Sequence, residues 1–143
     1  MTKILLPVDG SKHALRATRK LIDITLQFLE RPDIVPLFVH LPVPRVGGIA
    51  TVVGASTLRD YYRKEGEAAL APVERLLAKA GYEVKSGIQV GQIANTIVEY
   101  AKRNKCDMIC LGTRGMTAAA NLVMGSVATK VLHLADIPVI VIK

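Results

Sequence analysis

The sequence predicts a single-domain α/β fold, residues 1–143, in which helices cover both faces of a doubly wound five-stranded parallel sheet. Three observations support this fold class. Five short apolar runs alternate with amphipathic helical patterns along the chain. Most of these runs are continuously apolar, as expected for parallel strands that are buried on both faces. The length of 143 residues fits one domain, and no change in composition marks a linker.

The first apolar run predicts a strand from Lys3 to Val8. The turn Asp9-Gly10-Ser11 follows, and Ser11 is a favourable N-cap for the next helix. We expect that helix to span Lys12 to Leu29, with a buried stripe that includes Ala14, Thr18, Leu21, Thr25 and Phe28, widened by Leu15, Ile22 and Leu29. The second strand is predicted from Ile34 to Leu41.

Residues 42–56 hold two prolines and three glycines, which predicts a mobile flap near a ligand or a dimer contact. A long helix is predicted from Leu58 to Ala80, with a bend or break at Gly66 or Pro72 and with Gly81 after its end. Apolar and polar residues then alternate from Tyr82 to Val90, which is typical of a strand at a sheet edge.

The last part of the chain predicts a helix, a strand, a helix and a strand, at Gln92 to Asn104, Cys106 to Leu111, Ser126 to Leu134 and Val139 to Ile142. The two cysteines, Cys106 and Cys110, fall in one of these strands. Four residues of strand separate their Cα atoms by about 13 Å, whereas a disulfide needs about 7 Å or less. Two buried thiols are therefore expected.

The net charge of +7 is spread along the chain, and the tyrosines form no base-stacking motif. Nucleic acid is therefore an unlikely partner, and we expect a basic surface that attracts anionic ligands in general. The apolar runs fall short of the roughly 18 residues of a membrane helix. We expect a cytoplasmic protein without a membrane segment.

The stretch from Leu111 to Val127 contains three glycines, Gly112, Gly115 and Gly125, and Ser126 stands where a helix is predicted to begin. Glycines allow close backbone approach and positive φ, and a helix N-terminus offers unpaired N–H groups, so this pattern predicts an anion site. Arg114 adds donors suited to phosphate. If the first and fourth strands are neighbours, Asp9 faces this stretch across the crevice at the sheet's switch point.

Two common nucleotide motifs are missing from the sequence. Ser126 follows Gly125 without the lysine of a P-loop, and Asp9-Gly10-Ser11 does not match the dinucleotide motif Gly-x-Gly-x-x-Gly. Ser11 is better explained as an N-cap than as a nucleophile, because no His and acid stand at a triad spacing. His40, at the end of an apolar strand, is better explained as a core residue than as a base.

The pattern Gly112-x2-Gly115-x9-Gly125-Ser126, with Pro7-Val8-Asp9-Gly10-Ser11 near the start, resembles the universal stress protein family over the whole chain. The resemblance implies an adenine nucleotide alpha hydrolase-like sheet of order 3-2-1-4-5 and an ATP-binding member, with Mg or Mn as the metal. It implies a nucleotide site formed by Pro7, Val8, Asp9, Leu41, Leu111, Gly112, Arg114, Gly115, Gly125, Ser126 and Val127.

Within that implied site, Asp9 binds the ribose or adenine side, and backbone groups of Val8 and Leu41 hold the adenine. Gly112, Arg114 and Gly115 wrap the ribose and phosphates. Gly125, Ser126 and Val127 present donors to the phosphates. A carboxylate suits sugar hydroxyls and repels phosphates, whereas a helix N-terminus attracts them, so the chemistry of these residues agrees with that division.

The first function hypothesis is a nucleotide-dependent stress or signalling switch with slow or no hydrolysis, since no general base or water-positioning residue is identifiable. The alternative is a module that works through protein partners or another adenine nucleotide, and a third hypothesis is a weak ATPase. Residues 116–120 are small and uncharged where relatives often carry basic or bulky residues, which predicts a loose loop without ligand. The resemblance also implies a homodimer through Val139 to Ile142, a short strand that is apolar on both sides.

Overall fold

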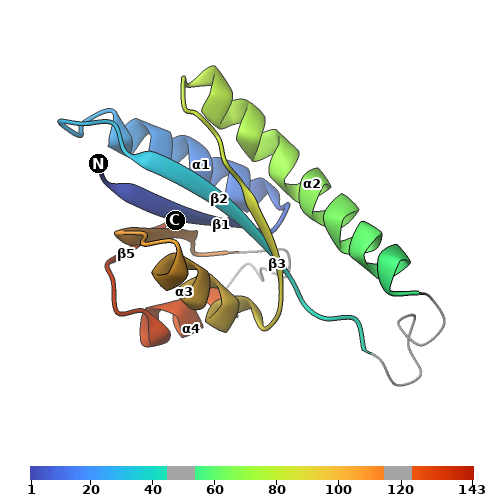
Figure 1. Cartoon of the computed structure of the whole chain (residues 1–143). Coiled ribbons are helices and arrows are strands. Elements are labelled where there is room, and N and C mark those ends of the chain that lie inside the picture. Colours follow the sequence, from blue (N-terminus) through green and yellow to red (C-terminus); the bar gives the residue numbers. More distant parts are fainter. Residues whose placement is uncertain (45–53, 115–123) are drawn as a thin grey trace.

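The protein folds into a three-layer α/β structure, seen in the computed structural model, which describes residues 1–44, 54–114 and 124–143 (Figure 1). Its elements in chain order are β1 (Lys3–Val8), α1 (Lys12–Thr25), β2 (Asp33–His40), α2 (Ala55–Lys79), β3 (Gly87–Val90), α3 (Ile93–Arg103), β4 (Met108–Gly112), α4 (Ser126–Leu134) and β5 (Val139–Ile142). The strands form one parallel sheet of order β3-β2-β1-β4-β5. The predicted fold class and strand order are confirmed.

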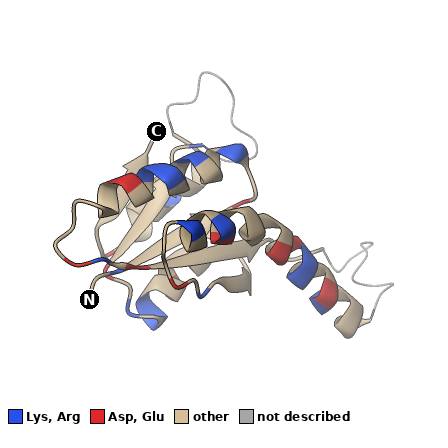
Figure 2. Ribbon diagram, turned by 90° about the horizontal axis from the view of Figure 1, so that it is seen from above, with Lys and Arg blue, Asp and Glu red and all other residues tan. Residues whose placement is uncertain are grey.

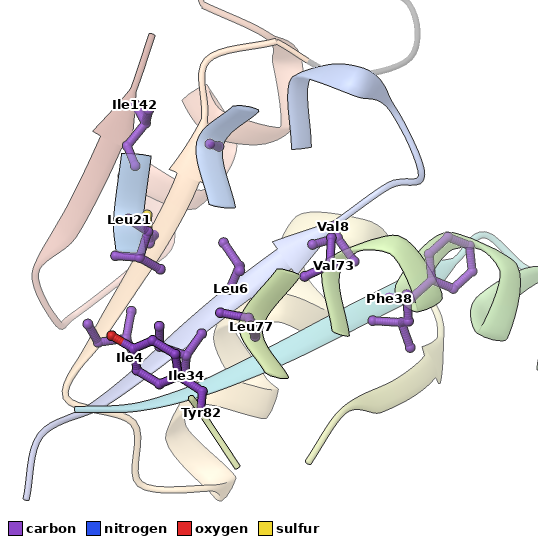
Figure 3. Packing of buried hydrophobic residues seen from close by; sticks show 13 residues of the cluster. Ile4, Leu6, Val8, Leu21, Ile34, Phe38, Val73, Leu77, Tyr82 and Ile142 are labelled. Atoms are coloured by element: carbon purple, nitrogen blue, oxygen red, sulfur yellow. The ribbon is translucent and has the colours of Figure 1, made fainter. Parts of the chain in front are cut away.

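Helices α1 and α2 cover one face of the sheet, and α3 and α4 cover the other (Figure 1). The protein therefore has two hydrophobic cores, one on each face of the sheet, and the side chains of β1 point alternately into one and the other. Ile4, Leu6 and Val8 join the core under α1 and α2, which Figure 3 shows, whereas Leu5 joins the core under α3 and α4. Because both faces are covered, the central strands need apolar residues at every position.

The first helix ends earlier than predicted, at Thr25 rather than Leu29. The amides of Gln27 and Phe28 donate to carbonyls three residues back, those of Ile24 and Thr25, so the chain tightens into turns there. Phe28 still packs against the core, but Leu29 points into solvent with its side chain fully exposed. The prediction that Leu29 widens the buried stripe is therefore wrong.

The long helix α2 is continuous, and Pro72 lies inside it without dividing it. Proline leaves one carbonyl four residues earlier without its helical donor. That residue, Ala68, is exposed, so water can satisfy its carbonyl. The prediction for Gly81 is confirmed, since it follows the helix with φ of +85° while the amide of Tyr82 donates to Leu77.

The edge strand β3 is confirmed at the sheet edge but is shorter than the predicted Tyr82–Val90. Its ladder with β2 begins at Leu37 and Gly87. Continuing that register back by one residue sets Ser86 against Pro36, which has no N–H to donate. Tyr82 instead packs into the α1 side of the core, where its hydroxyl lies 2.6 Å from the Thr25 hydroxyl.

Two other predictions concern α4 and the segment after β2. The predicted inward position of Leu134 on α4 is wrong, because that side chain is exposed and Ala128 is buried instead. The predicted flap at 42–56 lies mostly outside the described residues. Among the helices of the described ranges, none combines the length and apolarity needed to span a bilayer.

Candidate functional site

The strand order reverses between β1 and β4, so the crevice beyond their carboxyl ends is the place where ligands bind in such sheets. These two strands are direct neighbours, with Ile4 paired to Met108 and Leu5 paired to Ile109. Asp9 follows β1 and Gly112 ends β4. The structure therefore brings Asp9 and Gly112, at the start of the glycine stretch, to the same edge of the sheet, as the sequence predicts.

The turn after β1 fixes the orientation of Asp9. The backbone N–H of Ser11 donates to Oδ1 of Asp9 at 3.0 Å, and the Ser11 hydroxyl accepts from the amide of Ala14 at 3.1 Å. Gly10 has φ of +82°, and a Cβ there would lie 3.3 Å from Cβ of Ala69 on α2. The predicted N-cap role of Ser11 is confirmed, and the half-exposed Asp9 carboxylate is held by its own turn.

The described ends of the glycine stretch are joined by main-chain atoms. Leu111 is buried, and the next residues leave β4 through Thr113, whose amide donates to the carbonyl of Ile142 at 2.9 Å. The carbonyl of Thr113 accepts from the amide of Gly125 at 2.6 Å. A Cβ on Gly125 would lie 3.2 Å from that oxygen, so glycine is needed there for close approach.

Positive φ is not the reason for the two described glycines of this stretch. Gly125 has φ of −73°, and the glycines with positive φ in the described chain are Gly10 and Gly81. A Cβ on Gly112 would meet no described atom closer than 3.5 Å. Of the two properties that make glycine suitable here, Gly125 therefore uses close approach and not positive φ, and Gly115 lies outside the described residues.

The bond between Thr113 and Gly125 closes the glycine stretch as a neck. Helix α4 begins directly after this neck, at Ser126, and its N-terminus carries no side-chain cap. The first helical bond is donated by Thr129 to Gly125, so the amides of Ser126, Val127 and Ala128 have no acceptor within the helix. The first turn, all of it described, carries no acidic residue. Ser126 is exposed and Val127 is half-buried. This helix end has the donors and dipole that favour an anion.

Basic residues surround the end of β4. A shallow depression beside it, on the α1 side, is lined in part by His13, Arg16, Arg114 and Lys143. Arg114 is exposed, and among the described residues no hydrogen bond joins it to Ser126. Figure 2 shows that other basic residues are distributed over several helices, with acidic residues among them along the first half of α2. The basic depression favours anionic ligands near the crevice.

A side-chain cluster that the sequence did not indicate stands at the end of β2. The Tyr62 hydroxyl of α2 accepts a hydrogen bond from the amide of Val43 at 2.8 Å. His40 is half-buried, and its Nδ1 lies 2.6 Å from the carbonyl of Leu41. His40 is thus bonded to the chain that follows its strand, rather than being a core residue. No periodic pattern signals a contact between residues 43 and 62, because it depends on how α2 crosses the sheet.

The two cysteines are buried free thiols, as predicted. Burial raises the pKa of Cys110 to about 12. Burial, followed by the negative charge of Asp107, also raises the pKa of Cys106. Protonated, buried thiols are poor nucleophiles and poor metal ligands. Within the described ranges, no three His, Cys, Asp or Glu side chains come together as a metal site.

Comparison with known proteins extends these observations over the whole chain. The sequence model of the universal stress protein family matches residues 1–143. Universal stress protein MJ0531 of Methanocaldococcus jannaschii is 32% identical over 141 residues, which are 99% of this chain and 81% of that protein. The structure of universal stress protein UspA from Lactobacillus plantarum is 27% identical, has a TM-score of 0.81 and covers 99% of this chain and 97% of its own.

Some structures of the same fold were solved with adenine nucleotides. A universal stress protein from Archaeoglobus fulgidus in complex with dAMP is 24% identical, has a TM-score of 0.70 and covers 100% of this chain and 98% of its own. One from Arabidopsis thaliana with AMP bound is 21% identical, with a TM-score of 0.66 and coverage of 100% and 92%. One in complex with cAMP is 20% identical, with a TM-score of 0.72 and coverage of 99% and 97%.

At those identities the three nucleotide complexes establish a shared fold. The family itself rests on the match to residues 1–143 and on the relative that is 32% identical over 99% of the chain. This chain belongs to the universal stress protein family.

Proposed function

We propose that this protein binds ATP, together with Mg or Mn, in the crevice beyond β1 and β4 and acts as a nucleotide-dependent stress or signalling switch. The observation that carries the proposal is the start of α4. Its first three amides have no acceptor within the helix and follow Gly125, whose own amide is bonded to Thr113, and its first turn holds no acidic residue. Such an end binds phosphate groups. Adenine nucleotides in proteins of the same fold agree with the proposal.

The charges along the crevice determine which end of the proposed nucleotide lies at β1 and which lies at α4. Asp9 suits ribose hydroxyls and repels phosphates, so the nucleoside belongs at the β1 side, near Pro7 and Val8. Leu41 and Leu111 supply apolar atoms and backbone groups for the base and sugar. We assign the path from the ribose to the phosphates to Gly112 and Arg114, and to Gly115 from the family resemblance alone. The phosphates belong at Gly125, Ser126 and Val127.

We expect hydrolysis to be slow or absent. Phosphoryl transfer to water requires positioned metal, a cationic group at the transferred phosphate and a residue that orients the water. The sequence places no P-loop lysine before Ser126. Arg114 and the other basic residues at the end of β4 supply positive charge, but the sequence identifies no residue that would orient the attacking water. A weak ATPase remains the least supported of the three hypotheses.

A second candidate function is binding of a different adenine nucleotide. The relatives solved with AMP, dAMP and cAMP favour it, because each of these ligands carries a single phosphate. A site that gains little from the second and third phosphates binds AMP as tightly as ATP. The same module could then act on protein partners without ATP.

Calorimetric titration tests both candidates on one protein. We expect Mg-ATP to bind and AMP to bind more weakly. Ser126→Ala should weaken ATP by roughly 10- to 100-fold, since a hydrogen bond to a charged group is worth about 1.5–3 kcal/mol. Ser56→Ala is the matched control, because Ser56 lies in the first turn of α2, which also follows a glycine N-cap. Equal affinities for AMP and ATP favour the second candidate, and no binding at millimolar nucleotide refutes both.

We also propose a homodimer that pairs β5 across a two-fold axis. β5 ends the sheet, and Val139, Ile140 and Val141 are only half-buried, so the strand presents an open apolar edge. Val141→Lys places a charge on that edge and should shift the mass measured by light scattering from dimer to monomer. A wild-type monomer at the concentrations used for the titrations contradicts this proposal.

A further inference from the structure

The residues just after β2 form one wall of the proposed nucleotide site, and the sheet does not hold them. The ladder between β2 and β3 ends at the pair His40 and Val90. Leu41 follows with its side chain 48% exposed. Beyond the ladder, the position of Leu41 must therefore be set by other contacts.

The Val43 amide joins this segment to α2 by a hydrogen bond. It donates to the Tyr62 hydroxyl at 2.8 Å. Pro42 and Pro44 flank Val43 and have no N–H, so Val43 carries the sole main-chain donor of residues 42–44. Losing the Tyr62 hydroxyl leaves that donor without its partner, and no neighbouring amide can take over the bond.

Aromatic packing fixes the other side of the same segment. The His40 ring packs edge-on against Tyr62 and Tyr61, with ring centroids 5.0 Å and 5.5 Å away. Its Nδ1 lies 2.6 Å from the Leu41 carbonyl, which accepts the bond when that nitrogen carries the proton. Tyr62 thus contacts the segment twice, through its ring at His40 and through its hydroxyl at Val43.

We propose that Tyr62 is a positioning residue of the nucleotide site, whose hydroxyl holds residues 41–43 in the conformation that contacts the base. This inference rests on the proposed function. A wall fixed before the ligand arrives avoids the entropy cost of ordering it on binding, so affinity is higher with the bond than without it. By linkage, a bound nucleotide must also stabilise the Val43–Tyr62 bond.

The coupling between nucleotide binding and the Val43–Tyr62 bond extends to a part of α2 that lies beyond the sheet. Figure 1 shows the N-terminal part of α2 continuing past the end of β2. Tyr62 lies in that part, seven positions after Ala55 where α2 begins. Occupancy of the base side of the crevice is therefore expected to rigidify the start of α2, a surface from which a bound state can be recognised.

The test compares two neighbouring tyrosines by titration with Mg-ATP and with adenosine, which has no phosphate. Tyr62→Phe keeps the ring and removes the hydroxyl, and we expect it to weaken both ligands by the same factor, roughly 3- to 10-fold, the value of one hydrogen bond. Tyr61→Phe is the control, since Tyr61 touches the same His40 ring, and it should stay within about twofold of wild type. Amide hydrogen exchange at Val43 should slow when ATP is added to wild type and speed up in Tyr62→Phe.

Several results overturn the proposal. They are wild-type affinity in Tyr62→Phe, equal losses in the two tyrosine variants, or a loss for ATP without a loss for adenosine. Absence of nucleotide binding by the wild type refutes the proposed function, and the inference with it. That failure is distinct, because Val43 exchange in the two ligand-free proteins still reports whether the hydrogen bond exists in solution.

Discussion

Replacing Gly125 by alanine tests the neck that closes the glycine stretch. The protein supplies a close control in Gly54. Both glycines are N-caps without a side-chain cap bond, with φ and ψ of −73° and 163° at Gly125 and −66° and 160° at Gly54. They differ in their surroundings. A Cβ at Gly125 would lie 3.2 Å from the Thr113 oxygen, whereas a Cβ at Gly54 would meet no described atom within 4 Å.

The expected free energies follow from that difference. Alanine is a poorer N-cap than glycine by about 0.5–1 kcal/mol, and it stabilises by about 0.4–1 kcal/mol through the unfolded chain, so Gly54→Ala should be nearly neutral. At Gly125 the same two effects apply, but the Thr113 carbonyl must also move away. Since its own amide is tied to Ile142, that movement lengthens a main-chain hydrogen bond. We expect Gly125→Ala to be about 1 kcal/mol less stable than Gly54→Ala.

Urea unfolding of the two variants measures this difference directly. Nucleotide titration measures its functional consequence, because the part of the separation between Thr113 and residue 125 that is taken up by residue 125 misplaces the amides of Ser126 and Val127. We expect Gly125→Ala to weaken Mg-ATP by roughly 10- to 100-fold, the loss of one charge-assisted hydrogen bond, and Gly54→Ala to leave the affinity unchanged. If the two variants are equally stable and bind ATP equally, the neck has no energetic role and the reasoning is refuted.

Three further predictions concern the core. Gly66→Ala should destabilise the protein by about 1–2 kcal/mol in urea unfolding although alanine favours a helix, because its Cβ would lie 2.6 Å from Cδ1 of Ile88. The control Ala68→Gly, on the exposed side of α2, should cost about 1 kcal/mol in the same assay. Burial raises the pKa of Cys110 from 9.0 to about 12, so the unfolded thiol loses its proton first. The unfolding free energy should therefore fall between about pH 9 and 12, by up to about 1.4 kcal/mol per unit, and Cys110→Ala should lack this component. Tyr82→Phe removes a buried hydroxyl 2.6 Å from a threonine hydroxyl of α1 and should cost about 1 kcal/mol in the same assay. A stabilised Gly66→Ala, an unchanged pH dependence in Cys110→Ala or a neutral Tyr82→Phe would contradict the respective argument.

The strands and helices that the sequence predicts best are those whose ends carry strong local signals. The strand Lys3–Val8, the helix Ser126–Leu134 and the strand Val139–Ile142 match the structure at both ends. Each is bounded by a glycine, a proline or a capping serine nearby, and these residues act through their own backbone. Local chemistry is therefore sufficient to predict the ends of these three elements.

Predictions failed where a distant partner decides the structure. The alternation from Tyr82 to Val90 is that of a strand, but a strand also needs a neighbour, and the ladder with β2 starts only after Pro36. The helical pattern through Leu29 likewise continues beyond the point where Phe28 turns into the core. Neither limit is visible in the periodicity of the segment itself.

The candidate site was predicted in part for the same reason. Asp9 follows β1 and Gly112 ends β4, and parallel strands bring their carboxyl ends to one edge, so topology alone joins them. The Val43–Tyr62 bond and the Thr113–Gly125 bond depend on side-chain reach and on main-chain geometry across the fold. The sequence marks Gly125 as unusual without giving the reason, which is the oxygen of Thr113.

The bond between Thr113 and Gly125 has a consequence for how the fold can change its ligand. It uses main-chain atoms alone, and Thr113 is anchored in turn to Ile142 of β5. These two main-chain bonds tie the start of α4 to β5 and need no side-chain atom at Thr113 or Gly125. Closing a somewhat longer or shorter loop costs little free energy. If a foreign loop is grafted between these two residues, α4 should stay in place. The ligand preference can then be changed by replacing this loop while the domain stays folded.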